Sequence, residues 1–252
     1  MKKCLNQLLF AFGFLTVMPG LGRINIEPRD MGGSVVFYPA VGVCIGGMVY
    51  AISLADFFTP LFISIVVCVF LLVITRGVHA DGLIDTFDGF LASGKTRNQV
   101  LGIMKDSGAG ALGVAAAFCV YLLKIGLVYE LVQTGRGGVF LVVFPVMSRA
   151  GVAAAGWLFP YAGRPGSMGE CFLSSIKARH VLLSAAFMEV IFLLTGIPLL
   201  LVLGAASLFF WVCWGFLCMA RIGGVTGDTT GAGVEICEVF SLAVLLLLAF
   251  SM

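Results

Sequence analysis

The sequence predicts an all-α fold: a polytopic integral membrane helical bundle in which about seven transmembrane helices form a single domain over residues 1–252, with its active site facing the cytoplasm. Composition and the length of the apolar segments are the observations behind this prediction. Hydrophobic residues make up 60% of the chain, charged residues only 11%, and the mean hydropathy is +1.11. A water-soluble domain carries about a quarter charged residues. The 15 basic and 13 acidic side chains are therefore too few to cover a 26.6 kDa globule in water.

A helix crosses the hydrocarbon core of a bilayer with about 20 apolar residues. Segments of this kind are predicted at 34–55, 57–75, 109–129, 138–158, 181–196, 199–220 and 233–251. The division between the fifth and sixth spans rests on the turn Gly196-Ile197-Pro198, so six or eight spans remain open. The segment from Leu5 to Met18 is too polar for the core of a signal peptide and runs into Pro19, which predicts a short helix at the membrane surface.

Basic residues fix the predicted orientation. With a cytoplasmic N-terminus, Arg136 alone lies outside, while Lys124 and Arg149 lie within spans. Under the positive-inside rule, the cytoplasmic side then holds Lys2, Lys3, Arg23, Arg29, Arg76, Lys95, Arg97, Lys105, Arg164, Lys177, Arg179 and Arg221. The sequence therefore predicts a multi-pass protein of the cytoplasmic (inner) membrane, with its N-terminus and active site on the cytoplasmic side. The lipid bilayer is the expected partner, and a net charge of only +2 argues against nucleic acid.

Three carboxylates are clustered in one predicted cytoplasmic segment. Asp81, Asp85 and Asp88 are spaced i, i+4 and i+7, so on one helix they share an arc of about 60°. Three anions this close repel one another unless a cation lies among them, and oxygen ligands without Cys or His suit Mg²⁺ or Mn²⁺. The alternative is an acidic helix end stabilised by the helix dipole, or ion pairs with nearby basic residues such as Arg76.

A second short helix is predicted to follow after a turn. Thr96-Arg-Asn-Gln99 resembles a capping box, and the helix that it opens carries Lys105 and Asp106 at its far end. In a helical hairpin Asp106 returns beside the first three carboxylates, while Lys105 supplies a positive charge suited to a phosphate. Three glycines within 108–113 begin the next span, where small residues favour close helix packing over the approach of a ligand.

The last predicted cytoplasmic segment is rich in glycine. Five glycines lie within residues 223–233, interspersed with Thr226, Asp228 and two further threonines. Such a loop can hold a phosphate or sugar through its N–H groups and hydroxyls, and Asp228 can complete a metal site, with Glu235 as a weaker candidate. An ordinary turn at the membrane edge is an equal alternative.

Single charged residues inside spans are costly to bury and indicate either ion pairs or a functional site. Arg149 either pairs with an acid or binds a diphosphate through both ends of its guanidinium. Lys124 is interpreted as structural. His79 falls on the helix face opposite the aspartates and is interpreted as a residue of the helix entry. Glu189 is the only acid expected deep in the membrane, which disfavours a cation-coupled transporter.

Clustered aspartates, nearby basic residues and a glycine-rich second segment together predict metal-assisted chemistry on a diphosphate. A metal ion neutralises charge and orients the leaving group, while a carboxylate takes a proton from an attacking hydroxyl. The residues alone lead to a membrane phosphotransferase or a prenyltransferase-like enzyme. An enzyme acting on a CDP-alcohol or a prenyl diphosphate stays open as an alternative, although the usual Asp-Gly-x-x-Ala-Arg pattern is missing.

A family resemblance is more specific. The stretch His79-Ala-Asp-Gly-Leu-Ile-Asp-Thr-Phe-Asp-Gly89, continuing to Ile103-Met-Lys-Asp-Ser107, strongly resembles the central motif of cobalamin synthase, the adenosylcobinamide-GDP ribazoletransferase family. Three further stretches resemble that family in the same order along the chain: Phe14 to Pro19, Ser148 to Gly166, and Gly223 to Ala232. One departure is at 108–113, where the family usually has a basic residue and Thr-Phe-Gly. This departure puts a phosphate contact at residue 108 in doubt.

The resemblance implies a late step of cobalamin (vitamin B12) biosynthesis, the closing of the nucleotide loop. A hydroxyl of α-ribazole, or of α-ribazole 5′-phosphate, attacks the diphosphate of adenosylcobinamide-GDP, giving adenosylcobalamin or its 5′-phosphate and GMP. The metal that the family uses is Mg²⁺. The resemblance implies no particular oligomeric state, so a monomer and a homo-oligomer are both compatible with it.

The resemblance also implies roles for individual residues. Four carboxylates are expected to bind the metal, and one of the last two to act as general base: Asp81, Asp85, Asp88 and Asp106. Four residues are expected to bind phosphate, nucleotide or metal-bound substrate: Lys105, Arg149, Thr226 and Asp228.

Replacing Asp81 or Asp85 with asparagine is expected to abolish turnover, because the amide cannot supply the negative charge that holds a divalent cation. The variant protein should still insert into the membrane, which a fractionation of membranes will show. Normal activity of either variant at equal expression would contradict the assignment.

Overall fold

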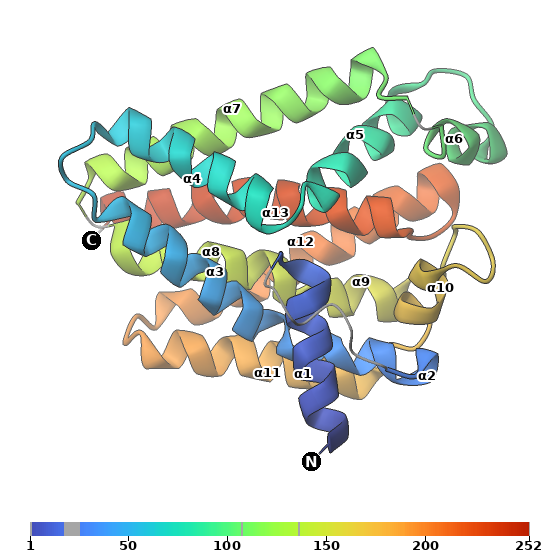
Figure 1. Cartoon of the computed structure of the whole chain (residues 1–252), viewed down its shortest axis with the longest axis horizontal. Coiled ribbons are helices and arrows are strands. Elements are labelled where there is room, and N and C mark those ends of the chain that lie inside the picture. The colour runs from blue at the N-terminus through green and yellow to red at the C-terminus, as the bar shows by residue number, and fades with distance from the viewer. Residues whose placement is uncertain (1, 18–25, 107, 136, 252) are drawn as a thin grey trace.

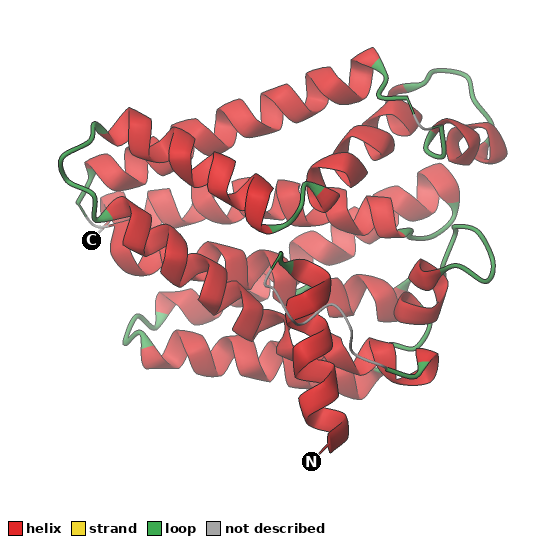
Figure 2. Ribbon diagram, in the orientation of Figure 1, coloured by secondary structure: helices red, strands yellow, loops and turns green. Residues whose placement is uncertain are grey.

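The computed structural model describes residues 2–17, 26–106, 108–135 and 137–251 of the chain. These residues form helices joined by short loops, and the described part contains no β-sheet, only one isolated bridge (Figure 2). The predicted all-α class is therefore confirmed. The elements are α1 (Lys2–Leu15), α2 (Pro28–Met31), the 3-10 helix η1 (Gly32–Phe37), α3 (Tyr38–Ser53), α4 (Pro60–Ile74), α5 (Val78–Leu91), α6 (Arg97–Ile103), α7 (Ala111–Gln133), α8 (Gly137–Ala150), α9 (Val152–Leu158), α10 (Met168–Leu173), α11 (Ala178–Leu194), α12 (Leu199–Ile222) and α13 (Gly227–Ser251).

Most of the long helices run side by side as a bundle, and α1 lies across them (Figure 1). Helix α7 lies along both α4 and α5, while α13 packs against α5, α7 and α8. The location of α1 at the membrane surface, expected for residues 5–18, stays a prediction. Helix α1 begins earlier than predicted and ends at Leu15, and residue 18 lies outside the described residues.

Five segments of the described chain are long and apolar enough to cross a membrane, or six if the bent pair α4–α5 counts as one span. The five are Pro28–Ser53, Ala111–Gln133, Gly137–Leu158, Leu199–Ile222 and Gly227–Phe250. The protein is therefore a polytopic helical membrane protein, and the predicted count of seven is not confirmed. Helix α11, with 17 residues, is shorter than these five. Five residues used in the sequence argument lie outside the described residues: Met18, Pro19, Arg23, Ser107 and Arg136.

The start of α13 differs from the prediction. The helix begins at Gly227, whereas the last span was predicted from 233. Thr226 and Thr229 cap it reciprocally: Thr229 N donates to Thr226 Oγ1 at 3.1 Å, and Thr226 N donates to Thr229 Oγ1 at 2.8 Å. Most of the predicted glycine-rich loop is therefore helical, because these caps satisfy the first N–H groups. Asp228 lies in the first turn of α13 as a result.

Helices α4 and α5 meet at an angle of 90°, at the junction formed by Thr75, Arg76 and Gly77. Arg76 and Gly77 both have positive φ, 57° and 68°, and only glycine adopts this conformation without strain. The Arg76 guanidinium donates to the carbonyl oxygens of Gly13 and Phe14, at 2.9 and 3.2 Å. Arg76 therefore caps the C-terminal end of α1 and ties it to the bend.

Close packing of α3 on α8 depends on two glycines of α3. A methyl group at Gly42 would lie 2.6 Å from Val146 Cα, and one at Gly46 would lie 2.7 Å from the carbonyl carbon of Val142. Small residues four apart allow helix backbones to approach in a membrane, where packing rather than the hydrophobic effect drives association. Gly47 is adjacent but faces open space, and a methyl group there would have no neighbouring atom within 4 Å.

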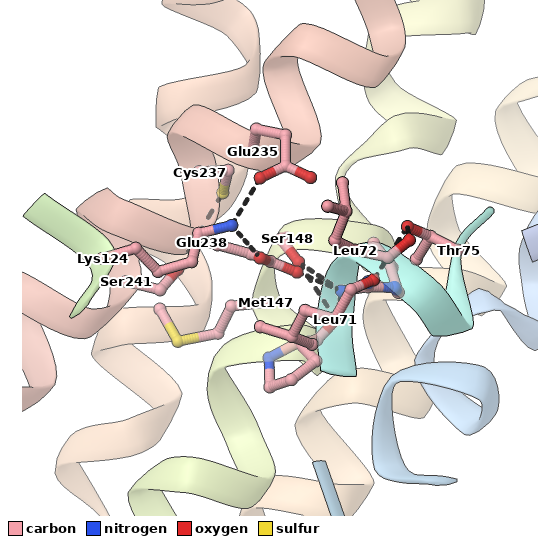
Figure 3. Close-up of polar contacts among 12 residues, drawn as sticks. Leu71, Leu72, Thr75, Lys124, Met147, Ser148, Glu235, Cys237, Glu238 and Ser241 are labelled. Carbon is pink, nitrogen blue, oxygen red and sulfur yellow. Dashed lines mark hydrogen bonds and ion pairs between the residues drawn. The ribbon is translucent and has the colours of Figure 1, made fainter. Parts of the chain in front are cut away.

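Four charged side chains form a network inside the bundle. Lys124 Nζ of α7 lies 2.5 Å from Glu235 Oε2 and 2.7 Å from Glu238 Oε2, both of α13 (Figure 3). Glu238 Oε1 in turn accepts a hydrogen bond from Arg149 of α8 at 2.6 Å. All four residues are at most 4% exposed. The expectation that Glu189 is the only deep acid is wrong, because Glu235 and Glu238 are buried within the span candidate Gly227–Phe250. Lys124 and Arg149 neutralise them there.

Replacing Gly46 with alanine is expected to lower the free energy of unfolding by about 1–3 kcal/mol, because the methyl group collides with the α8 backbone. The matched control is Gly47→Ala, which removes a helix-interior glycine without a collision and should be neutral or stabilising. Thermal unfolding of both variants in detergent measures the difference. Equal unfolding temperatures for the two variants would contradict this account of the α3–α8 contact.

Candidate active site

Four of the predicted carboxylates and one lysine line a single cavity of about 450 Å³. Asp81 and Asp85 come from α5, Lys105 and Asp106 from the segment after α6, and Asp228 from the first turn of α13. The negative charges of Asp81, Asp85 and Asp228 act on one another across this acidic cavity, and Lys105 offsets part of that charge. The helical hairpin thus returns Asp106 to the α5 carboxylates, as the sequence predicted.

A close contact between α5 and α13 brings their aspartates together. Gly82 of α5 faces the α13 backbone, and a methyl group there would lie 2.7 Å from the carbonyl oxygen of Asp228. A larger side chain would therefore push the two helices apart. Because Gly82 directly follows Asp81, the same contact places Asp81 beside Asp228 at the edge of the acidic cavity.

Helix α6 is held against α5 and α12, and it positions the remaining cavity residues. The predicted capping box is confirmed, since Thr96 N donates to Gln99 Oε1 at 2.9 Å. Buried Val100 and Met104 pack on Gly89 of α5. One amino group of Arg97 donates to the carbonyl oxygen of Gly223 at 3.3 Å, which joins α6 to the end of α12. Lys105 and Asp106 follow directly after this anchored helix.

Asp88 does not line the acidic cavity. Its two carboxylate oxygens accept hydrogen bonds from the backbone N–H groups of Gly110 and Gly113, both at 2.7 Å. These N–H groups belong to the first turn of α7, so Asp88 acts as a helix cap. Methyl groups at Gly110 and Gly113 would collide with this carboxylate, which agrees with the predicted packing role for these two glycines, whereas Gly108 faces open space. Metal binding or base catalysis by Asp88 stays a prediction, and the cap is the role that the structure shows.

Two predicted substrate-binding residues have partners within the chain. Arg149 is 1% exposed, pairs with Glu238 and does not line the acidic cavity, so of its two interpretations the structure shows the ion pair. Thr226 is 4% exposed and its hydroxyl caps α13. Glu235, the weaker candidate, pairs with Lys124 rather than joining the aspartates. Phosphate binding by Arg149 and Thr226 stays a prediction.

A second cavity of about 320 Å³ adjoins the acidic one and shares Lys105 and Asp228 with it. Its other polar walls are Tyr161, Arg164, Ser167 and Thr226. The two segments that carry these residues lie side by side, since Val225 N donates to Pro160 O at 2.9 Å and Ala162 N donates to Val225 O at 2.8 Å. Sequence reasoning assigned no role to Arg164, although it lies in one of the stretches that carried the family resemblance.

A third cavity, of about 170 Å³, lies on the other side of Asp81 and Asp228 and has mostly apolar walls. His79 lines it and is only 6% exposed. The helical spacing correctly placed His79 away from the acidic face of α5. Spacing on one helix did not reveal the cavity, because α1, α3, α10 and α13 form its other walls.

The donor set of the acidic cavity is compatible with magnesium. Mg²⁺ prefers oxygen ligands and binds through one or two carboxylates, waters and substrate phosphates. Among the described residues, no group of three or more His, Cys, Asp or Glu side chains is close enough to hold a metal without such additional ligands. Magnesium binding by these carboxylates stays a prediction.

Comparison with known proteins identifies the family. The model of the cobalamin-5-phosphate synthase family matches residues 7–246. The chain belongs to this family. Curated relatives named adenosylcobinamide-GDP ribazoletransferase include those of Pseudomonas paraeruginosa (36% identical, covering 98% of this chain and 100% of the relative), Desulforamulus reducens (32%, covering 96% of each) and Brevibacillus brevis (33%, covering 96% and 98%). No solved structure matches the chain significantly.

Membership of the cobalamin-5-phosphate synthase family confirms the resemblance seen in the motifs. It makes this protein a transferase of cobalamin biosynthesis with several apolar membrane helices. The central motif supplies Asp81, Asp85, Lys105 and Asp106 to the acidic cavity, and the last stretch supplies Asp228. Segments that are separated in the sequence therefore meet at one place in the fold.

Replacing Asp88 with asparagine is expected to lower the unfolding temperature, because only one oxygen remains to accept from two backbone N–H groups. Loss of one of these part-buried hydrogen bonds to a charged group costs about 1.5–3 kcal/mol of folding free energy. Asp85→Asn is the control: it removes one of several like charges that repel one another in the cavity, so the unfolding temperature should stay the same or rise. An Asp88→Asn protein that unfolds like the wild type but has no activity would instead indicate a direct role in the reaction.

Proposed function

We propose that this protein is an adenosylcobinamide-GDP ribazoletransferase. It joins adenosylcobinamide-GDP and α-ribazole, or α-ribazole 5′-phosphate, to give adenosylcobalamin, or its 5′-phosphate, and GMP. The observation that carries this proposal is the acidic cavity, where Asp81, Asp85, Asp106, Asp228 and Lys105 converge in a member of the family. The names of the relatives supply the substrates of the proposed reaction.

The proposed reaction exchanges one phosphorus–oxygen bond for another. A ribose hydroxyl oxygen bonds to the cobinamide-side phosphorus of the diphosphate, and the bond from that phosphorus to the bridging oxygen breaks. GMP leaves with the bridging oxygen, and the hydroxyl proton passes to a carboxylate. Asp106 is the proposed base, because it lines the cavity while both oxygens of Asp88 already accept hydrogen bonds.

Mg²⁺ would be held by two of the carboxylates of Asp81, Asp85 and Asp228 together with phosphate oxygens of the substrate, and it would supply positive charge against the diphosphate and its leaving group. Lys105 lies in both the acidic cavity and the adjoining cavity, so its ammonium group can contact a phosphate that bridges the two. Arg164, on the far wall of the adjoining cavity, is placed to bind the nucleotide phosphate of the donor.

In this proposal the protein lies in the cytoplasmic (inner) membrane, with its N-terminus and the acidic cavity on the cytoplasmic side. The distribution of basic residues supports this orientation. The cation-coupled transporter is not supported by the buried acids, because Glu235 and Glu238 are neutralised by Lys124 and Arg149.

Membranes containing this protein are expected to release GMP and form the corrinoid product from adenosylcobinamide-GDP, α-ribazole 5′-phosphate and Mg²⁺. Removal of the metal with EDTA should stop both, since four carboxylates cannot hold a diphosphate without a cation. Chromatography of GMP and of the corrinoid product measures the reaction. Re-addition of Mg²⁺ should restore it.

The control is the Asp81→Asn protein in membranes prepared in the same way, which should be inactive with and without the metal. Absence of GMP from correctly inserted wild-type protein would overturn the ribazoletransferase proposal. CDP-alcohol and prenyl diphosphate donors then test the alternative transferase class.

A further inference from the structure

The apolar cavity beside Asp81 and Asp228 is a candidate binding site of its own. It lies where α1, α3, α5, α10 and α13 meet, and its volume is about 170 Å³. Three aromatic rings form part of its wall: the Phe172 centroid lies 5.5 Å from that of Phe14 and 6.0 Å from that of Tyr38. Leu15, Val152 and Leu173 also line it.

Two buried polar atoms in this cavity wall make no hydrogen bond within the described part of the chain. They are Nδ1 of His79 and the hydroxyl of Tyr38, whose side chains are 6% and 1% exposed. The Ser34 hydroxyl lies near Tyr38 but donates to the Met31 carbonyl oxygen. Buried polar groups normally have partners, because a lost hydrogen bond to water is otherwise uncompensated. A ligand in the cavity would supply them.

The size of the cavity limits the ligand to one small planar ring system. An apolar protein cavity of about 150 Å³ binds benzene, so a cavity of about 170 Å³ admits a single flat aromatic system, and a fused bicycle would fill it closely. Aromatic walls favour stacking with a flat ring. The other polar groups on the wall are engaged elsewhere: the hydroxyls of Thr75 and Thr230 donate to backbone carbonyl oxygens, and Asp81 and Asp228 are shared with the acidic cavity. The ring can therefore carry only a few polar atoms, which His79 and Tyr38 would satisfy.

These limits distinguish the bases of the two substrates in the proposed reaction. Guanine has donors and acceptors along most of its edge, and it would need Asp81 and Asp228, which the proposed reaction uses in the acidic cavity, in addition to His79 and Tyr38. The benzimidazole of α-ribazole has an apolar carbocycle and, once joined to ribose, one free ring nitrogen that accepts a single hydrogen bond. The cavity therefore fits the base of the acceptor better than that of the donor.

We propose that this cavity binds the benzimidazole ring of the acceptor riboside, and that Tyr38 or His79 donates a hydrogen bond to its free nitrogen. The proposal rests on the proposed ribazoletransferase function and assigns a place to its second substrate. Because Asp81 and Asp228 line both this cavity and the acidic cavity, a ribose attached to the bound ring reaches the carboxylates. The donor, adenosylcobinamide-GDP, then occupies the adjoining cavity, which Lys105 and Arg164 line.

The decisive variant is Tyr38→Phe, which removes one oxygen and keeps the ring. Loss of one hydrogen bond is expected to raise the KM for α-ribazole about fivefold, while kcat and the KM for adenosylcobinamide-GDP stay within about twofold. The matched control is Tyr129→Phe, because the Tyr129 hydroxyl accepts a hydrogen bond from Gln133 of the same helix, away from this cavity. That control should leave all three constants unchanged.

A second variant tests the other unpartnered polar group, His79. His79→Leu removes both ring nitrogens and keeps a side chain of similar bulk. An increase of the riboside KM in at least one of the two variants supports the proposal. Unchanged riboside KM values in both variants overturn it, and so does an increase that affects the KM of adenosylcobinamide-GDP instead.

A binding experiment tests the assignment of this cavity independently of the proposed reaction. Purified full-length protein in detergent is dialysed to equilibrium with radiolabelled 5,6-dimethylbenzimidazole, without a second substrate or metal. Binding to the wild type that weakens in Tyr38→Phe and is displaced by α-ribazole but not by guanine supports the cavity assignment, even if no GMP is released in the activity assay. Absence of binding, or displacement by guanine but not by α-ribazole, overturns the assignment. Displacement by added detergent or lipid but not by α-ribazole also overturns it, because it identifies an ordinary lipid site.

Discussion

The ion network inside the bundle is the constraint on which the rest of the site depends. Lys124, Arg149, Glu235 and Glu238 join α7, α8 and α13 through contacts of 2.5–2.7 Å. Removal of charges from water is costly, and the loss of any one partner leaves an uncompensated charge. Because Asp228 lies seven residues before Glu235, both occupy the same face of α13. Pairing of Glu235 with Lys124 therefore fixes the rotation of α13 that directs Asp228 to α5.

The same helix rotation makes Asp228 the meeting point of three cavities of different chemistry. One is acidic, one carries Arg164 and Tyr161, and one is lined by aromatic and aliphatic side chains. A reaction that joins a charged nucleotide donor to an aromatic riboside needs both environments next to the reacting phosphorus. The Gly82 contact with the α13 backbone allows that proximity, since any larger residue would separate α5 from α13.

Cobalamin-5-phosphate synthase motifs that are dispersed along the chain are contiguous in the fold. The Arg164 segment lies against the glycine-rich segment through the Tyr161–Val225 bridge, and Arg97 joins α6 to Gly223. The end of α1 is tied to the α4–α5 bend by Arg76. The three cavities are accordingly lined by residues from segments spread between α1 and α13.

The sequence by itself determined the class of protein, the family and the acidic hairpin. Composition predicts a membrane protein, and the capping box at Thr96 and the turn before Pro198 are local signals that act within a few residues. Tertiary structure decided which charged side chains remain available to bind a ligand. Asp88 shares its helical face with Asp81 and Asp85, yet it caps α7, and Lys124 pairs with a glutamate 111 residues away. Helical spacing gives the direction of a side chain relative to its own axis, whereas its partner depends on how closely and at what rotation another helix packs against it.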